Sequence, residues 1–488
     1  MKALIWIALL LGVCLAHAEP APPPANPLAI VTQDGVALRA QARHSATTQA
    51  VLWQGENLEV RGRTLDYLQV YDHRLERAGF VHASEVRIVS MRPDDAPELL
   101  AIVRFLRDMP GSEALGIAYT AAYLKAAPGK AIDAEPFAAL GVMAERLARR
   151  ASANPRKSEE QSLSGQLEVV ADYGVAIRSI DRNGHMRLCY DGEAFRRVMA
   201  LDATGVQKAT AALALTDPAC VDPGMPPVQR AAFDTWSADL LDRVPREGLP
   251  SYVQNRLRMR AASVWSAIAF EHTRSHEPAQ QAASRAIDEL AAVDTHALVE
   301  SDRDDYNDAV IRVGASRWAA EPLLKAGTDL HIVTAAGRPG ETCIKLLDRK
   351  HDEKTPLVQR CTYGTVWTSS ARANAHGTAL ALAVQPMTSW RELWLFHVVG
   401  KQWVIDALPP ADDDPQLGYL EFAGWVPGDR LMLAAREARV NGRFIHRFEI
   451  VDMVTLATTR QADKPSSLSP FYRYQDAIWR SQTVSLRD

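Results

Sequence analysis

The sequence lacks an excess of charge of either sign, and beyond its first residues it lacks long apolar runs. Among 488 residues, 55 are basic and 59 are acidic, which gives a net charge of −4. Because nucleic-acid binding depends on a basic surface that neutralises phosphates, we expect no nucleic acid among the partners. A membrane-spanning helix needs about 20 apolar residues, and no stretch after residue 18 supplies them. We therefore predict no membrane span.

Local signatures of catalysis are also lacking. The chain has no Gly-x-Ser-x-Gly elbow, no Ser-x-x-Lys, no His-Glu-x-x-His and no phosphate-binding loop with its lysine. The nearest echo of such a loop, residues 337–342, contains a proline, and we interpret it as a turn between strands. The sequence predicts no catalytic residue and no cofactor. The sequence disfavours an enzyme, but it leaves open one whose active site is assembled from distant residues.

Two polar groups remain as candidates for a metal site, and both have simpler interpretations. His272 and His276 are four residues apart, a spacing that places two ligands on one helical face. Pro278 follows closely, so we expect His272 near a helix C-terminus, where it suits the helix dipole, and His276 in a turn. The acidic run 412–414 precedes a proline and is typical of a solvated turn. We predict no metal ligand.

The first eighteen residues indicate export. Lys2 supplies a positive charge, residues 3–15 are almost wholly apolar, and residues 16–18 (Ala-His-Ala) are typical of a cleavage site. We predict a signal peptide over 1–18, cleaved near Ala18, and a periplasmic or secreted mature protein. Cys14 suggests a lipoprotein anchor as an alternative, but the residue before it is not the small one that such a signal needs. Residues 19–29 are rich in proline, which favours an extended segment.

Cysteine is scarce, with five residues in the whole chain. Removal of the signal peptide leaves four, and an even number in an oxidising compartment favours disulfides. Of the three possible pairings we expect the short-range one, because each of its pairs falls within one proposed domain. A zinc site is the second interpretation, but the chain has no Cys-x-x-Cys and no histidine pair at finger spacing. The predicted bridges are Cys189–Cys220 and Cys343–Cys361.

Residues 30–89 show short runs of alternating hydrophobicity separated by turn residues, which is typical of β-strands. Around residue 69, Leu68 and Val70 face one way, while Tyr67 and Tyr71 face the other. We predict a small all-β module here. Tyr67 and Tyr71 are its candidate binding residues because two aromatic rings on the polar side of one strand form a recognition surface.

Three sequence pieces in this segment resemble the bacterial SH3 (SH3b) family. Residues 36–39 (Val-Ala-Leu-Arg) resemble its early Val-x-Leu-Arg strand, residues 51–55 its hydrophobic run ending in glycine, and residues 79–82 (Gly-Phe-Val-His) its closing strand. Tyr67 stands where that family usually has tryptophan. The resemblance implies an SH3-like barrel over 30–89 that contacts peptidoglycan peptides or an envelope protein.

Downstream of residue 94 the hydrophobic period changes from that of strands to that of helices, and after about residue 328 it changes back. The polar stretch near residue 155 is a candidate linker. We predict a multidomain α+β fold: the SH3-like barrel, central α-helical hairpin domains and a C-terminal all-β domain, either a partial propeller or a sandwich. The predicted divisions after the barrel are a small helical bundle at 94–150, a linker at 151–165, a mainly helical domain at 166–325 and a β-rich domain at 327–488.

These observations favour an exported binding or scaffold protein associated with peptidoglycan or envelope proteins. A cell-wall hydrolase with a non-local active site and a periplasmic regulator of another protein are the alternatives that the sequence leaves open.

Overall fold

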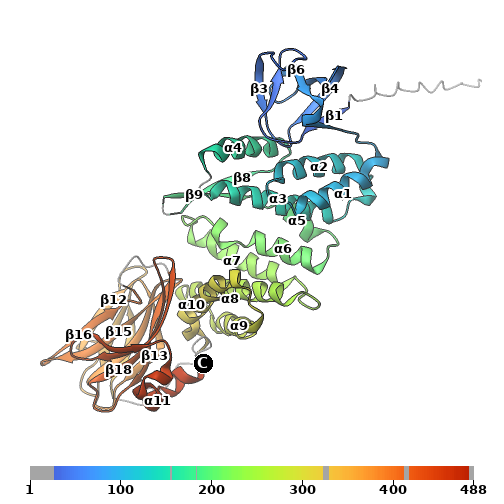
Figure 1. Ribbon diagram of the computed structural model, residues 1–488. Helices are drawn as coiled ribbons and strands as arrows, with labels where there is room; N and C mark the ends of the chain where they lie inside the picture. The colour runs from blue at the N-terminus through green and yellow to red at the C-terminus, as the bar shows by residue number, and fades with distance from the viewer. Residues whose placement is uncertain (1–26, 154–155, 183, 322–328, 412–416, 483–488) are drawn as a thin grey trace, which may run out of the picture. The chain divides into compact units, whose positions relative to one another are not determined.

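The computed structural model describes residues 27–153, 156–182, 184–321, 329–411 and 417–482, which form a mixed α+β structure with several antiparallel sheets (Figure 1). The predicted signal peptide, most of the proline-rich segment and the acidic run at 412–414 lie outside these residues. The chain divides into two compact units. The N-terminal unit comprises residues up to 132 together with 142–177, and the C-terminal unit comprises 133–141 and 178–488. No helix in the described ranges is long and apolar enough to cross a membrane.

The N-terminal unit begins with a seven-stranded antiparallel sheet in the order β3-β2-β6-β5-β4-β1-β7. Alternating burial along the strands builds its core, because every second side chain points inward. Leu38, Leu58, Val70 and Val81 are almost completely buried there. The strands are β1 (Leu28–Val31), β2 (Val36–Arg39), β3 (Thr48–Leu52), β4 (Asn57–Thr64), β5 (Tyr67–Asp72), β6 (Arg77–His82) and β7 (Val86–Val89).

Helices complete this unit: α1 (Ala96–Arg107), α2 (Glu113–Ala126), the second part of α3 (Glu135–Ser152) and α4 (Lys157–Asp172). The prediction of a linker over 151–165 is wrong, because α3 continues to Ser152 and α4 begins at Lys157. The polar residues of this stretch belong to an amphipathic helix whose buried face carries Leu163, Val169 and Val170. The predicted domain boundary at 165–166 therefore falls inside α4.

Two close contacts fix the sheet against these helices. A Cβ atom at Gly165 of α4 would lie 2.4 Å from the indole of Trp53, so only glycine permits this approach. Gly55 likewise lies against the backbone of Ala114 in α2. The absence of a side chain at Gly165 and Gly55 therefore lets α4 lie against the indole of Trp53 and lets the sheet lie against the backbone of α2.

A buried carboxylate organises the helices of the N-terminal unit. Glu113, at the first turn of α2, is completely buried and accepts hydrogen bonds from the amide of Gly111 at 3.0 Å and from Arg146 Nε at 2.5 Å. Arg150 also donates to it. Burial by itself raises the pKa of Glu113, but these donors outweigh it and hold that pKa below its usual value of 4.5.

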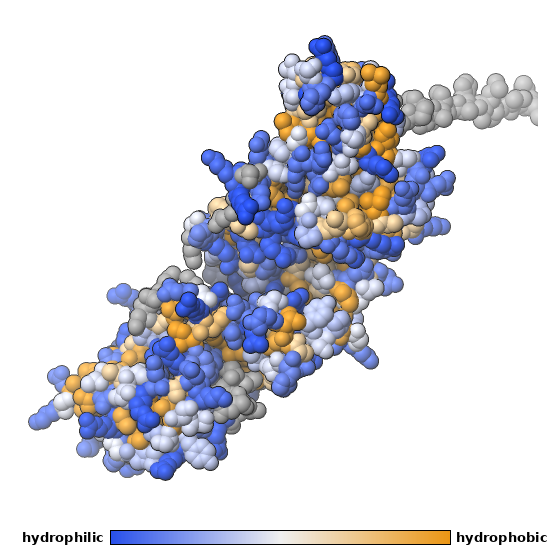
Figure 2. All heavy atoms as spheres, viewed as in Figure 1, coloured by the Kyte–Doolittle hydropathy of each residue, from blue (hydrophilic) through white to orange (hydrophobic). Residues whose placement is uncertain are grey.

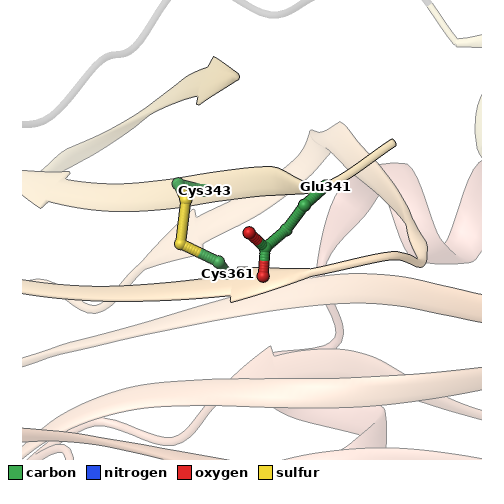
Figure 3. A group of neighbouring side chains, drawn as sticks. All are labelled: Glu341, Cys343 and Cys361. Atoms are coloured by element: carbon green, nitrogen blue, oxygen red, sulfur yellow. A yellow bond between two sulfur atoms is a disulfide. The ribbon is translucent and has the colours of Figure 1, made fainter. Parts of the chain in front are cut away.

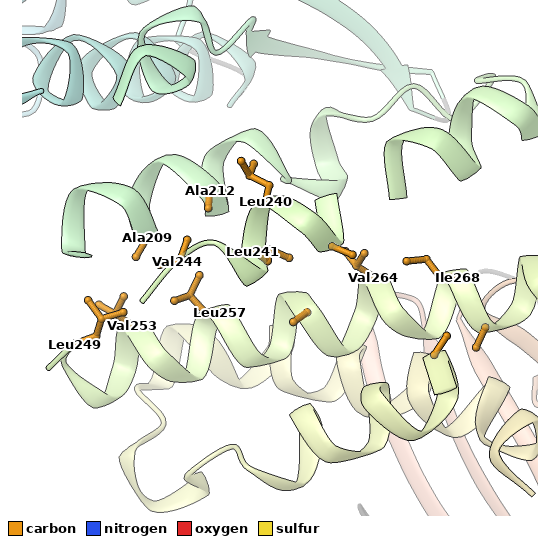
Figure 4. Close-up of a cluster of buried hydrophobic side chains, with 14 of the residues drawn as sticks. Ala209, Ala212, Leu240, Leu241, Val244, Leu249, Val253, Leu257, Val264 and Ile268 are labelled. Atoms are coloured by element: carbon orange, nitrogen blue, oxygen red, sulfur yellow. The ribbon is translucent and has the colours of Figure 1, made fainter. Parts of the chain in front are cut away.

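Between residues 177 and 316, a hairpin of two strands is followed by α-helical hairpins, within the region that was predicted to be mainly helical. A core of alanine, leucine and valine side chains, including Leu241, Leu257 and Ile268, lies between α6, α7, α8 and α9 (Figure 4). The alanines let the helix axes approach closely. The elements are β8 (Ile177–Arg182), β9 (His185–Tyr190), α5 (Glu193–Ala200), α6 (Gly205–Leu215), α7 (Pro227–Asp242), α8 (Ser251–Arg274), α9 (Gln280–Ala291) and α10 (Arg303–Ser316).

Three antiparallel meanders follow in chain order, and they stack face to face. The first is β10 (His331–Ala336), β11 (Thr342–Leu347) and β12 (Val358–Thr362). The second is β13 (Thr365–Ala373), β14 (Ala379–Met387), β15 (Trp390–Val399) and β16 (Gln402–Leu408), and the third is β17 (Gly418–Trp425), β18 (Leu431–Val440), β19 (Arg443–Asp452) and β20 (Thr458–Ala462). A short parallel pairing of β15 with β17 joins the second and third into one sheet.

The first seven residues of β14, at the centre of the middle meander, are buried on both faces, which explains why they are almost continuously apolar. Leu380 and Leu382 of β14 pack against the first meander, while Ala379 and Ala381 face the third. The outer face of the third meander is covered by α11 (Ser469–Tyr474) and α12 (Ala477–Gln482), through residues such as Phe471. The prediction of an all-β C-terminal region is therefore wrong at 469–482, where apolar side chains cover a sheet face as short helices.

A buried ion cluster joins the helices of the C-terminal unit to its sheets. Glu421 of β17, only 3 % exposed, accepts from Arg317 Nε at 2.9 Å. Its other oxygen lies 3.3 Å from Nη2 of Arg391, a side chain of β15 that is completely buried. Arg391 Nη1 also donates to the carbonyls of Gly314 and Ala315 at the end of α10. One carboxylate thus pairs with two arginines, one that follows α10 and one on β15.

Candidate functional site

The two tyrosines predicted to bind a ligand do not form an exposed pair. Tyr67 is buried at the start of β5, where its ring packs edge-on against His82 with centroids 5.2 Å apart. Tyr71 is half-buried, with the Arg61 guanidinium 3.9 Å from its ring centroid. The alternation of side-chain direction along β5 was predicted correctly, but Tyr67 is buried by packing at the first residue of the strand. Tyr71 alone remains available at a partly open position.

Both predicted disulfides are present, Cys189–Cys220 and Cys343–Cys361. Cys343 and Cys361 lie directly opposite each other on β11 and β12, and Glu341 approaches them so that the three ligand-type atoms lie within 4.8 Å (Figure 3). Because the two sulfurs are bonded to each other, they are not thiolates that hold a metal. Residues 337–341 form the turn between β10 and β11, as predicted.

The histidine pair does not share a helical face. His272 lies in the last turn of α8, and its Nδ1 is 3.1 Å from the carbonyl oxygen of Pro278. His276 follows the helix in the left-handed region, with φ of 60°. The interpretation of these residues as a helix terminus and a turn is confirmed.

The clearest gathering of chemically active side chains lies within the N-terminal unit, where β4 and the β5–β6 turn meet α4. A cavity of about 250 Å³ opens there. We call it the seam pocket. It is lined by Glu56, Asn57, His73, Arg74, Val169, Asp172 and Tyr173.

Glu56 and Arg74 form the floor of the seam pocket. Glu56 is 3 % exposed, and its Oε1 accepts from Nη2 of Arg74 at 2.6 Å and from Nε at 3.1 Å. Its second oxygen accepts from the amide of Trp53 at 2.9 Å. Burial raises the pKa of Glu56 above 4.5, in opposition to the hydrogen bonds from Arg74 and Trp53. The site therefore holds a carboxylate in an environment that penalises its charge.

Tyr173, directly after α4, closes one wall. Its hydroxyl donates to the carbonyl of Gly55 at 2.7 Å and accepts from Nδ2 of Asn57 at 3.1 Å. Burial raises the pKa of this hydroxyl to about 12, so it remains protonated at physiological pH. Tyr173 therefore holds the end of α4 against the sheet through two hydrogen bonds and does not act as a base.

The mouth of the pocket is acidic and open to solvent. Asp172 Oδ2 lies 3.8 Å from Arg74 Nε, and Glu168 Oε2 lies 3.3 Å from Arg74 Nη1. The side chains of Asp172 and Glu168 are 48 % and 63 % exposed. His73 beside them is also exposed, and its Nε2 lies 2.7 Å from Oε2 of Glu59. Both acidic side chains can turn toward a bound group.

Sequence reasoning missed the seam pocket because its two halves are about a hundred residues apart along the chain. Residues 56–74 come from the β module, and residues 168–173 come from the stretch that was interpreted as a linker and its continuation. A helical interpretation of 157–172 would have placed Glu168 and Asp172 one turn apart on one face. Nothing in the sequence indicated that this face meets Arg74.

On the face drawn in Figure 2, the hydrophobic side chains of the described residues occur in scattered groups between hydrophilic ones. Comparisons with known proteins add no further identification: no family model matches the chain, and neither does any curated protein or solved structure.

Proposed function

We propose that this chain is an exported binding protein whose N-terminal unit attaches it to peptidoglycan or to another protein of the cell envelope. The seam pocket carries the proposal, because it combines a cavity of about 250 Å³ with a charged, partly open lining. Its groups suit recognition: Tyr173 is held by two hydrogen bonds, and Glu56 is committed to Arg74 and Trp53. Such preorganised polar groups fix the orientation of a ligand.

Two observations support the proposed location of the protein and the proposed fold of this unit. The two disulfides fit an oxidising compartment such as the periplasm or the exterior. We infer an SH3-like fold for β1–β7 from the quoted motifs: residues 36–39 form β2, residues 79–82 end β6, and Arg39 pairs with Phe80 in their register. Two of the three segments that resemble the family are therefore neighbours in one sheet.

Co-sedimentation of the mature chain with purified peptidoglycan tests the proposal. We expect the wild-type chain to be retained and Asp172→Trp, which fills the mouth of the pocket, to be lost from the pellet. Glu160→Trp is the matched control, because Glu160 is exposed on the same helix and does not line the pocket. If the wall retains no chain, cross-linking in the periplasm should capture a protein partner for the wild type and not for Asp172→Trp. Failure of both assays contradicts the proposal.

A further inference from the structure

The disulfide between Cys343 and Cys361 joins two residues that the sheet already holds together. The cysteines are directly paired in the antiparallel ladder of β11 and β12, and this pairing continues as far as Leu346 and Val358. Ile344 and Leu346 are completely buried in the core on one face of the sheet. Side chains alternate along a strand, so the two cysteines lie on the opposite face. Backbone pairing and this core therefore keep the cysteines side by side when the bridge is opened.

A carboxylate stands beside the two sulfurs. One oxygen of Glu341, which directly precedes β11, and the two Sγ atoms lie within 4.8 Å of one another (Figure 3). The amide of Arg338 donates to Oε2 of Glu341 at 3.0 Å. A Cβ atom at Gly337 would lie 2.7 Å from that oxygen and 2.9 Å from Sγ of Cys343, so glycine leaves the space that both groups occupy. The turn, and not the disulfide, therefore holds the carboxylate beside the sulfurs.

The bridge is open to attack from solvent at Cys361. This residue is half-buried, whereas Cys343 is only 8 % exposed. The exposed side chain of Gln359 lies on the same face, with its Nε2 3.8 Å from Sγ of Cys361. A thiolate of a dithiol reductant can attack this sulfur, which breaks the sulfur–sulfur bond and releases Cys343 as a thiolate. The second thiol of the reductant then displaces Cys361, so that the reductant becomes a disulfide and the protein gains two thiols.

We propose that Cys343, Cys361 and Glu341 form a redox-gated zinc site, which a dithiol reductant opens and reoxidation closes. This inference goes beyond the proposed function and does not depend on it. Two thiolates and a carboxylate are ligands that zinc takes in tetrahedral sites, with a water molecule in the fourth position. Thiolates favour zinc over calcium and magnesium, which prefer oxygen ligands. Each thiol releases its proton when the zinc ion binds.

The test uses the full mature chain and Co²⁺ as a spectroscopic probe of the zinc site. After reduction and removal of the dithiol, we expect one Co²⁺ per chain with thiolate-to-cobalt charge-transfer absorption, which Zn²⁺ then displaces. The oxidised chain should show no such absorption. Glu341→Gln should weaken Co²⁺ binding about tenfold or more, because it removes a ligand. Glu353→Gln is the matched control, because Glu353 is exposed in the loop between the same two strands, and it should bind Co²⁺ like the wild type.

A double variant separates this site from the other cysteine pair. Cys343→Ser/Cys361→Ser keeps the bridge between Cys189 and Cys220 and should bind no Co²⁺ after the same treatment. Absorption that persists in this variant, or an unchanged affinity in Glu341→Gln, overturns the proposed ligand set. Alkylation followed by mass spectrometry shows whether the dithiol has opened the bridge of the folded wild-type chain. Failure to label Cys343 and Cys361 overturns the redox gate, and labelled cysteines without Co²⁺ binding overturn the zinc site.

Discussion

Replacing Glu421 by glutamine should destabilise the C-terminal unit strongly. The substitution keeps the size of the side chain and one acceptor oxygen, but it removes the negative charge that Arg317 and Arg391 share. Arginine does not lose its proton under ordinary conditions, so Arg391 remains a completely buried cation that donates to the backbone carbonyls of Gly314 and Ala315. Breaking a buried pair by removing one partner costs about 3–5 kcal/mol, and we expect about 3 kcal/mol because glutamine still accepts a hydrogen bond.

Urea unfolding of the mature chain, followed by tryptophan fluorescence, measures this loss. The two compact units need not unfold together, so the transition assigned to the C-terminal unit is the one to compare. With a slope of about 2–3 kcal/mol per molar urea, the midpoint of that transition should fall by about 1 M. Asp463→Asn is the control, because Asp463 is exposed on the same unit and should change stability by less than about 0.5 kcal/mol.

A second variant identifies the cause of the effect. Glu421→Gln combined with Arg391→Met should recover part of the lost stability, because the buried cation is removed together with its partner. The reasoning is refuted if Glu421→Gln behaves like Asp463→Asn. It is also refuted if the double variant is less stable than the sum of its single substitutions, since the loss would then come from packing rather than from charge.

Three further predictions concern other contacts. Glu113→Gln should lower the free energy of unfolding by about 2–3 kcal/mol at pH 7, measured by urea denaturation. Because the pKa of Glu113 is lowered in the folded state, its contribution is present above pH 4.5 and is lost as the pH falls through the folded value, so the variant and the wild type should converge in acid. Gly165→Val should separate α4 from Trp53 and abolish wall retention, and an unchanged affinity would contradict the role of this contact. Replacing Cys189 and Cys220 by serine opens a loop with a sequence separation of 31 and should cost about 3–4 kcal/mol, checked by thermal unfolding with and without reductant.

Local chemistry explains why much of the secondary structure was predictable. The helices α6 and α7 begin at clear local signals, the capping box of Thr204 with Gln207 and the proline at position 227. The disulfide pairing followed from an even cysteine count and proximity along the chain. In contrast, α4 was interpreted as a linker because its exposed face is polar and its few apolar residues are widely spaced, a pattern that also suits an open segment.

Residue types at short spacing were enough to predict the alternation of strand and helix periods and the two disulfides, and the composition alone gives the balance of charge. The burial of Tyr67, the pairing of Glu421 with two arginines and the contact of Arg74 with carboxylates of α4 could be seen in the folded chain alone. Those outcomes depend on which faces of distant elements pack together. Charge and burial at such a junction are properties of the assembled unit, and no local pattern encodes them.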